Sequence, residues 1–250
     1  MRLAILATLP LLVLVSCGDD SPSGADTQTL NVLAAASLTG SFDELAAMFE
    51  AEHEGVDVEG VYDSSSTLAT QVSEGAPADV LATADLDTMQ RVLDAGDADS
   101  SDTFAGNTAV LVTPAGNPAG ITSFADLDKK GVTYVVCVDT APCGKIGAAL
   151  LESNEIKAEP ASFEDNVKAV LEKVTAGEVD AGIVYVTDGK AAGADVIVVE
   201  IPGAADQVTG YAVAVVKQSE DAALAQAFVD LVLSAEGQAV LRDAGFVEAP

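Results

Sequence analysis

The chain has 250 residues, of which 49% are hydrophobic, and a formal net charge of −29 at pH 7. Such a charge disfavours nucleic acids and anionic membrane surfaces as partners, because both would repel the chain. The acidic residues are scattered along the sequence, which is typical of a solvated surface. A chain of this length can form one large domain or two lobes.

The first residues resemble an export signal. Arg2 precedes an apolar run that is too short to span a bilayer comfortably, and the run ends in the lipobox-like Leu14-Val15-Ser16-Cys17. We predict that residues 1–16 are a lipoprotein signal peptide and that Cys17 carries the lipid, so the mature protein is extracytoplasmic and anchored to the cell membrane. The alternative is an ordinary secretory signal with an incidental cysteine. Residues 17–29 are polar and contain Gly, Pro and Ser, which predicts a flexible tether.

After the tether, short β-rich runs alternate with stretches that carry apolar residues at helical spacing. This alternation predicts α/β units around mostly parallel sheets. Strands are predicted at 29–36, 56–63, 79–84, 108–114, 133–138, 181–186, 195–201 and 210–217. Helices are predicted at 40–53, 66–75, 86–96, 143–154 and 163–177, and residues 219–246 predict two helices that are separated near Ser234.

Several predicted helices begin at junctions rich in small or hydroxyl residues, namely Ser37, 64–67, 141–144 and 162–167. The backbone N–H groups of such junctions are unpaired, and the helix dipole favours negative charge there. In open α/β sheets these junctions line the crevice at the carboxyl ends of the strands. A serine at such a position can also be a simple N-cap. A cap needs one hydroxyl, so the run Ser64–Thr67 favours an outward-facing cluster of donors.

The chain contains few residues of the kinds that enzymes use for catalysis. His53 is the only histidine, and Cys137 and Cys143 are the only cysteines beyond Cys17, so the chain cannot build a His/Cys metal cluster. The sequence contains no GxSxG elbow, no GxxxxGK[ST] loop and no SxxK motif. We therefore expect a protein that is not an enzyme and that uses no cofactor or resident metal.

Five segments in order resemble the molybdate-binding proteins of ABC importers: NVLAAASLTGSFDELAAMFE, YDSSSTLATQVSEGAPADVLATAD, FAGNTAVLVTP, APCGKIGAALL and GEVDAGIVYVTDG. The resemblance runs from about Leu30 to Phe246. It implies a two-lobed, periplasmic-binding-protein-like α/β fold of type II, with two crossover strands at the hinge. Lobe 1 would hold residues 30–108 and 211–250, and lobe 2 would hold residues 109–210.

The resemblance also implies a set of ligand-binding residues. Ser37 and Ser65 would donate through their hydroxyl and backbone N–H groups, Cys143 and Val167 through backbone N–H groups, and Tyr185 through its phenol. From the residues alone, Tyr185 could equally be a core residue at the end of a strand. Lys145 and Lys168 flank these positions, and we expect them to be solvated neighbours of the site rather than ligands.

Cys137 and Cys143 lie six positions apart in a chain predicted to be exported. We hypothesise that they form a disulfide that braces the loop around the ligand, as is common in oxidising compartments. The bond requires that the two Cα atoms lie within about 7 Å of each other.

The resulting hypothesis is a monomeric, lipid-anchored binding protein that captures molybdate, and tungstate as well, and delivers it to an ABC permease. Molybdate is a fully deprotonated dianion, so hydroxyl and N–H donors suit it without any lysine or arginine. One alternative is another tetrahedral oxyanion such as sulfate. A remote alternative is an exported serine hydrolase that uses Ser64–Ser66, although no general base lies near these serines in the sequence.

Overall fold

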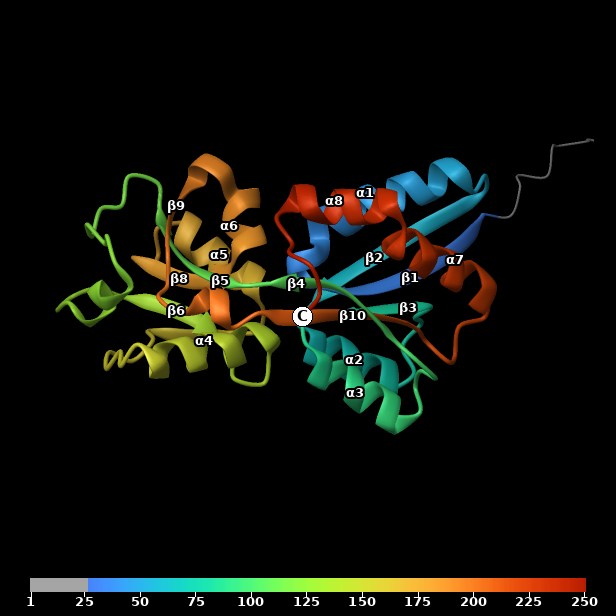
Figure 1. Cartoon of the computed structure of the whole chain (residues 1–250), viewed down its shortest axis with the longest axis horizontal. Coiled ribbons are helices and arrows are strands. Elements are labelled where there is room, and N and C mark those ends of the chain that lie inside the picture. Colours follow the sequence, from blue (N-terminus) through green and yellow to red (C-terminus); the bar gives the residue numbers. More distant parts are fainter. Residues whose placement is uncertain (1–26) are drawn as a thin grey trace, which may run out of the picture.

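The computed structural model describes residues 27–250. These residues form two lobes, each built around a five-stranded sheet (Figure 1). The predicted signal peptide, the predicted lipidation site Cys17 and residues 18–26 of the predicted tether lie outside this range. Strand β1 already includes Gln28 and Thr29, the last two residues that were assigned to the tether.

The sheet of lobe 1 has the strand order β2-β1-β3-β10-β4. Its strands are β1 Gln28–Ala35, β2 Val56–Asp63, β3 Val80–Thr83, β4 Asp102–Asn107 and β10 Thr209–Val215. Strand β1 pairs in parallel with β2 and β3, whereas β10 runs antiparallel to β3 and β4. The carboxyl ends of β1, β2 and β3 face the other lobe, since Ala35, Asp63 and Ala84 at these ends meet residues of lobe 2.

The sheet of lobe 2 has the order β7-β6-β8-β5-β9. Its strands are β5 Ala109–Pro114, β6 Tyr134–Cys137, β7 Ser162–Glu164, β8 Ala181–Tyr185 and β9 Val196–Val199. Strand β6 is parallel to β7 and β8, and β5 is antiparallel to β8 and β9. The two sheets therefore share one plan: four strands run in the same direction, and the fourth strand in each order, β10 or β5, runs against them.

Helices cover the faces of both sheets. In lobe 1 these are α1 Thr39–Glu52, α2 Ser65–Ser73, α3 Leu86–Ala95, α7 Ala222–Leu233 and α8 Ala235–Ala244. In lobe 2 they are α4 Pro142–Ser153, α5 Val167–Thr175 and α6 Val186–Ala192. Short 3₁₀ turns lie at η1 Ala36–Leu38, η2 Phe124–Asp128, η3 Gly193–Asp195 and η4 Ala204–Asp206.

Three elements were not predicted from the sequence: β4, β7 and α6. Strand β4 (DTFAGN) is poor in strand-forming residues and is held by its pairing with β10. The predicted helix over 163–177 is wrong at its start, because residues 162–164 form β7 beside β6 and the helix begins at Val167. Helix α6 contains a central glycine, and at its start the Asp188 carboxylate accepts from the backbone N–H of Tyr185, a contact that periodicity does not reveal.

The chain crosses between the lobes twice. The first crossing is at Thr108, between β4 and β5, and the second joins β9 to β10 through η4. Figure 1 shows both connections in the middle of the molecule, beside the C-terminus. Each lobe has its own apolar core, but Ala36 in η1 packs into the core cluster of lobe 2. The loop after β1 therefore reaches across the cleft.

Within residues 27–250, no single helix is long and apolar enough to cross a membrane. Helices α7 and α8 reach that length and composition only when taken together, and they are bent by 59° relative to each other. Both pack their apolar faces, which include Phe228, Val232 and Leu241, into the core of lobe 1.

Candidate functional site

A small cavity lies between the lobes, at the carboxyl ends of the parallel strands. The space open to the centre of a water molecule is about 10 Å³, close to the minimum that one ordered water needs. It is lined by Ala35, Ala36, Asp63, Ser64, Ser65, Ala84, Pro142, Cys143, Asn166, Val167 and Tyr185. The cavity therefore joins four of the five predicted ligand-binding residues, from both lobes, around a space for a small ligand.

Three helices begin at this cavity: α5, which is capped by Asn166, and two others, α2 from lobe 1 and α4 from lobe 2. The N-cap residues of α2 and α4 are Ser64 and Ala141, and within the described chain neither makes a side-chain cap bond. The Ser64 hydroxyl instead lies 3.0 Å from the Ser66 hydroxyl. The first N–H groups of a helix have no i−4 partner inside it, so those at the start of α2 are available to a ligand. In α4, Pro142 has no N–H and the Gly144 N–H donates to the Ala141 carbonyl at 3.0 Å, which leaves the N–H of Cys143.

The Ser65 side chain is 1% exposed and faces this cavity. Its oxygen accepts a hydrogen bond of 2.9 Å from the backbone N–H of Ala84, at the end of β3. This bond fixes the position of the oxygen and leaves the hydroxyl proton free. Ser65 is therefore a positioned donor, whereas Ser64 and Ser66 satisfy each other.

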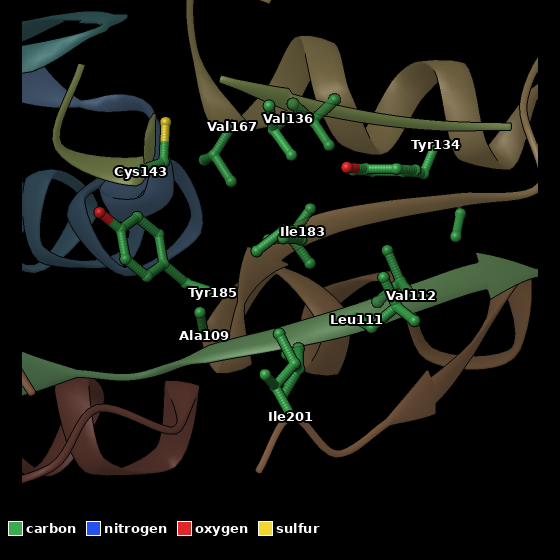
Figure 2. Packing of buried hydrophobic residues seen from close by; sticks show 14 of the residues in the cluster. Ala109, Leu111, Val112, Tyr134, Val136, Cys143, Val167, Ile183, Tyr185 and Ile201 are labelled. Carbon is green, nitrogen blue, oxygen red and sulfur yellow. The ribbon is translucent and has the colours of Figure 1, made fainter. Parts of the chain in front are cut away.

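Tyr185 ends β8 and lies opposite Ser65 across the cleft. Figure 2 shows Tyr185, Val167 and Cys143 at one end of the lobe 2 core, with the tyrosyl oxygen directed away from that core. The side chain is 1% exposed, yet its hydroxyl has no hydrogen-bond partner among residues 27–250. Burial, with Tyr211 and the carboxylates of Asp188 and Asp85, raises the pKa of Tyr185 well above its usual value. The phenol is thus a protonated donor without an acceptor in the described protein.

Ser37 lies beside the cavity and is not among its lining residues within the described chain; its neighbour Ala36 is. The Ser37 hydroxyl is 2.8 Å from the hydroxyl of Tyr211, which also accepts a bond from the Asn107 amide. The Asn107 oxygen accepts from the Thr108 N–H, so its NH₂ group must face Tyr211. Tyr211 can therefore donate to Ser37, which leaves the Ser37 proton for a further acceptor.

Cys143 occupies the first turn of α4, where a proline precedes it and Gly144 follows. Cys137 and Cys143 form a disulfide in the structure, and their Cα atoms are 5.7 Å apart. Gly144 packs against the same loop so closely that a Cβ atom there would lie 1.8 Å from the carbonyl oxygen of Val138. The loop between β6 and α4 is thus held tightly to the helix start that carries Cys143 and its N–H.

Two polar residues at the cavity were missed in the sequence, Asp63 and Asn166. The Asn166 amide donates to Asp63 Oδ1 over 2.9 Å, which links lobe 2 to lobe 1. The Ser64 N–H donates to the same oxygen at 2.7 Å. Asn166 also caps α5 by accepting from the Ala169 N–H, and this N-cap pattern could have identified it. The cavity therefore contains one carboxylate, but one of its oxygens already binds two donors.

The two lysines that flank the site are each paired with a carboxylate. Lys145 Nζ lies 2.5 Å from Asp85 Oδ2, and Lys168 Nζ lies 3.6 Å from Asp188 Oδ1. Neither lysine is among the residues of the described chain that line the cavity. The positive potential at the cavity therefore comes from helix N-termini and hydroxyl protons, as expected for an anion site without direct cations.

Asp188 lies behind Tyr185, at the start of α6, and is 1% exposed. Its Oδ2 accepts from the Tyr185 N–H, while Oδ1 has no hydrogen bond within residues 27–250. Burial raises the pKa of Asp188 to about 6, although Lys168 and the Tyr185 N–H lower it in part. The folded protein thus binds this proton more tightly than the unfolded chain does.

A pH dependence of stability follows from Asp188. Its folded pKa is above the ordinary value of 3.8, so its contribution to the free energy of unfolding decreases as pH rises from about 4 to about 6. Asp188→Asn removes this loss, and we expect its stability relative to wild type to rise by up to about 3 kcal/mol over that window. Denaturant unfolding of both proteins at pH 4, 5, 6 and 7.5 measures the difference. A difference that is constant with pH would contradict the assignment.

The serine cluster lacks the surroundings of a nucleophile. His53 stacks on Phe49, with ring centroids 4.0 Å apart, and is not among the described residues that line the cavity. The oxygen of Ser65 accepts from the protein backbone and so faces a donor rather than a base. Ser65 therefore has the geometry of a hydrogen-bond donor to a ligand, which is not the geometry that hydrolysis requires.

Comparisons with known proteins agree with this geometry. Residues 30–247 match the family model described as bacterial extracellular solute-binding protein. The chain is 41% identical over 242 residues to the molybdate-binding protein ModA of Mycobacterium bovis, covering 94% of this chain and 93% of the relative. The periplasmic molybdate-binding protein of Azotobacter vinelandii superposes with a TM-score of 0.76 at 21% identity, covering 88% of this chain and 100% of that one.

A further solved structure, the sulfate-binding protein SubI of Mycobacterium tuberculosis, has the same TM-score of 0.76 at 20% identity and covers 88% of this chain and 86% of its own. At this sequence identity, the structural similarity shows only that the fold is shared. Together with the two sheets of the structure, these neighbours confirm the predicted two-lobed α/β fold of type II.

Proposed function

Because the chain belongs to the bacterial extracellular solute-binding proteins, we propose that it captures molybdate between its lobes and delivers it to the membrane permease of an ABC importer. The predicted family and the expectation of a binding protein that is not an enzyme are both confirmed by the relatives. The hydrolase alternative is thereby set aside. The identity of the ligand and the details of its binding belong to the proposal.

The observation that carries the proposal is the buried Tyr185 hydroxyl, which lacks an acceptor among residues 27–250 and faces the small interlobe cavity. A buried donor without a partner costs about 1–3 kcal/mol, so a ligand oxygen at this position would remove a real penalty. Ser65 and the uncapped starts of α2 and α4 supply further donors on the other sides. A tetrahedral oxyanion can accept from all of these directions at once.

The hydrogen-bond donors around the cavity favour a ligand that carries no proton. Molybdate and tungstate carry no proton at neutral pH, so every one of their oxygens can accept. Hydrogen phosphate would bring a proton into a cavity whose groups mostly donate; Asp63 Oδ1 is already occupied by Ser64 and Asn166, so Oδ2 is the one carboxylate oxygen left to accept that proton. An unsatisfied buried donor is costly, which supports selection against protonated oxyanions. Sulfate shares the charge and shape of molybdate but is smaller, and it is the second candidate ligand.

We propose the binding roles residue by residue. Ser65 donates its hydroxyl and N–H from lobe 1, and Ser37 contributes from the neighbouring turn through its backbone and its hydroxyl. Cys143 and Val167 donate backbone N–H groups from the starts of α4 and α5, and Tyr185 donates its phenol. Since these residues belong to both lobes, the anion favours the closed arrangement, which would be the form recognised by the permease. We further propose that Cys17 carries a lipid that holds this monomeric protein at the membrane.

A series of thermal-shift measurements with different anions tests the proposal. Ligand at about 1,000 times its dissociation constant stabilises a protein by roughly 4 kcal/mol. We expect molybdate and tungstate to raise the melting temperature at concentrations where sulfate and phosphate have little effect. A shift with sulfate or phosphate but none with molybdate would overturn the proposal.

Tyr185→Phe separates a ligand-binding role from a core role. The change removes only the hydroxyl, so we expect molybdate binding to weaken by about 1–3 kcal/mol. The stability of the ligand-free protein should stay the same or increase, because a buried donor without a partner disappears. Calorimetric titration and denaturant unfolding measure the two effects. Unchanged affinity would assign Tyr185 to the core.

A further inference from the structure

We propose that Lys145 and Asp85 form a clasp between the lobes that sets the affinity for the anion without touching it. The inference rests on the proposed function, since it concerns closure of the same cleft. Lys145 lies in α4 of lobe 2, and Asp85 is the residue that caps α3 of lobe 1. Their ion pair of 2.5 Å therefore joins the two lobes.

The pair is well defined on both sides. Asp85 is 8% exposed, and its Oδ1 accepts from the Thr88 N–H at 2.9 Å, which holds the carboxylate in place while Oδ2 accepts from Lys145. The lysine also approaches Asp87 Oδ2 at 3.7 Å. A carboxylate that is fixed by a helix start loses little freedom when it binds the lysine, so this pair differs from ordinary surface pairs.

The clasp is connected directly to the anion cavity. Lys145 follows Cys143 by two residues in the same helical turn. On the other side, Ala84 precedes Asp85, lines the cavity and donates its N–H to the Ser65 hydroxyl. Neither charged residue is among the described residues that line the cavity. The ion pair thus lies one or two residues from a site residue in each lobe. It holds the two lobes together without contacting the ligand.

Binding depends on this arrangement because the anion must bind both lobes at once. The apparent dissociation constant equals the intrinsic one divided by the fraction of molecules in the competent state. An ion pair that exists only when the lobes meet raises this fraction. It also slows the release of the ligand, because opening must break the pair. Loss of the clasp should therefore increase the dissociation rate and leave the association rate nearly unchanged.

The electric field of the Asp85 carboxylate could also affect anion binding, but it predicts a different result from the clasp. Asp85 is a buried negative charge near Tyr185, whose pKa it helps to raise. If only the electric field mattered, removing that charge would strengthen the binding of an anion. If the clasp matters, Asp85→Asn must weaken binding, although asparagine is itself a good N-cap and should preserve α3. Whether Asp85→Asn weakens or strengthens anion binding therefore distinguishes the clasp from the field effect.

The test compares three variants with wild type by calorimetric titration and stopped-flow kinetics with molybdate. Lys145→Met and Asp85→Asn should each raise the dissociation constant about 3- to 10-fold. The double variant should be no weaker than either single variant, because both remove the same contact. Lys173→Met is the matched control: its pair with Glu164 spans 2.6 Å at similar exposure, but both residues lie in lobe 2. We expect wild-type affinity for this control.

Tighter or unchanged binding by Asp85→Asn would overturn the clasp. So would an equal loss in Lys173→Met, because a pair inside one lobe cannot hold two lobes together. If the wild-type protein does not bind molybdate, the proposed function fails. In that case small-angle scattering of the ligand-free proteins tests the clasp independently of the ligand. We expect Lys145→Met and Asp85→Asn to have a larger radius of gyration than wild type and Lys173→Met. Equal radii would reject the clasp in that case.

Discussion

Replacing Ser65 by alanine is expected to weaken molybdate binding by about 1–3 kcal/mol, because a hydrogen bond to a charged group is lost. The same change leaves the buried N–H of Ala84 without its acceptor, which lowers the stability of the free and the bound protein alike. Calorimetric titration measures the affinity. Denaturant unfolding of the ligand-free variant separates the cost of the Ala84 bond from the cost of the missing ligand contact.

The neighbouring serine provides the control. Ser66 is more exposed, its hydroxyl bonds to Ser64, and it is not among the described residues that line the cavity. Ser66→Ala should therefore bind molybdate with nearly wild-type affinity. If Ser66→Ala and Ser65→Ala lose the same affinity, the run of hydroxyls acts on the helix start as a whole, and Ser65 has no special role.

Gly144→Ala is expected to lose affinity at least tenfold and to have a lower midpoint of unfolding. The added Cβ would lie 1.8 Å from the Val138 carbonyl oxygen and 2.9 Å from that of Cys137. Backbone atoms cannot rotate away as a side chain can, so the loop or the first turn of α4 must move. Overpacking of this kind costs about 1–3 kcal/mol and occasionally more. The movement would also displace the Cys143 N–H from the cavity.

Gly147, one turn further along α4, is the matched control. A Cβ there would find its nearest neighbours, two atoms of Ile183, at 3.9 Å, an ordinary contact distance. Alanine is favoured over glycine inside a helix by up to about 1 kcal/mol. We expect Gly147→Ala to keep its affinity and to be as stable as wild type or more so. A Gly144→Ala variant that behaves like Gly147→Ala would show that the tight packing of the loop does not matter for binding.

Much of the fold could be predicted because its signals are local. The alternation of strands and helices, the break before α8 and the start of α2 all follow from periodicity and capping residues. Strand β4 could not be found in this way, because its Asp, Gly and Asn residues form a strand only through pairing with β10, about a hundred residues later. Strand β7 was missed for the same reason, since it forms by pairing with β6. The start of α5 has a local signal, the N-cap Asn166, which was overlooked.

The site residues that match motifs of known proteins could be predicted from the sequence. The contacts between residues far apart in the sequence could not. Tyr185 lies on a strand whose alternation fits either the core or the cleft, and only the arrangement of both lobes shows its hydroxyl at the cavity. The Asp63–Asn166 bond joins residues 103 positions apart, and the Ser37–Tyr211 bond joins residues 174 apart. No local pattern encodes such pairs, because the first depends on how the lobes meet and the second on how lobe 1 brings β10 to the turn after β1.

The proposal that the interlobe cavity holds a fully deprotonated tetrahedral dianion can be tested directly by calorimetric titration of the mature protein. Molybdate, tungstate, sulfate and phosphate would be titrated in separate experiments at the same pH and ionic strength. We expect molybdate to bind with one ion per chain, tungstate to bind similarly, and sulfate and phosphate to bind much more weakly. Saturable binding of sulfate or phosphate in the absence of any molybdate signal would contradict the proposal.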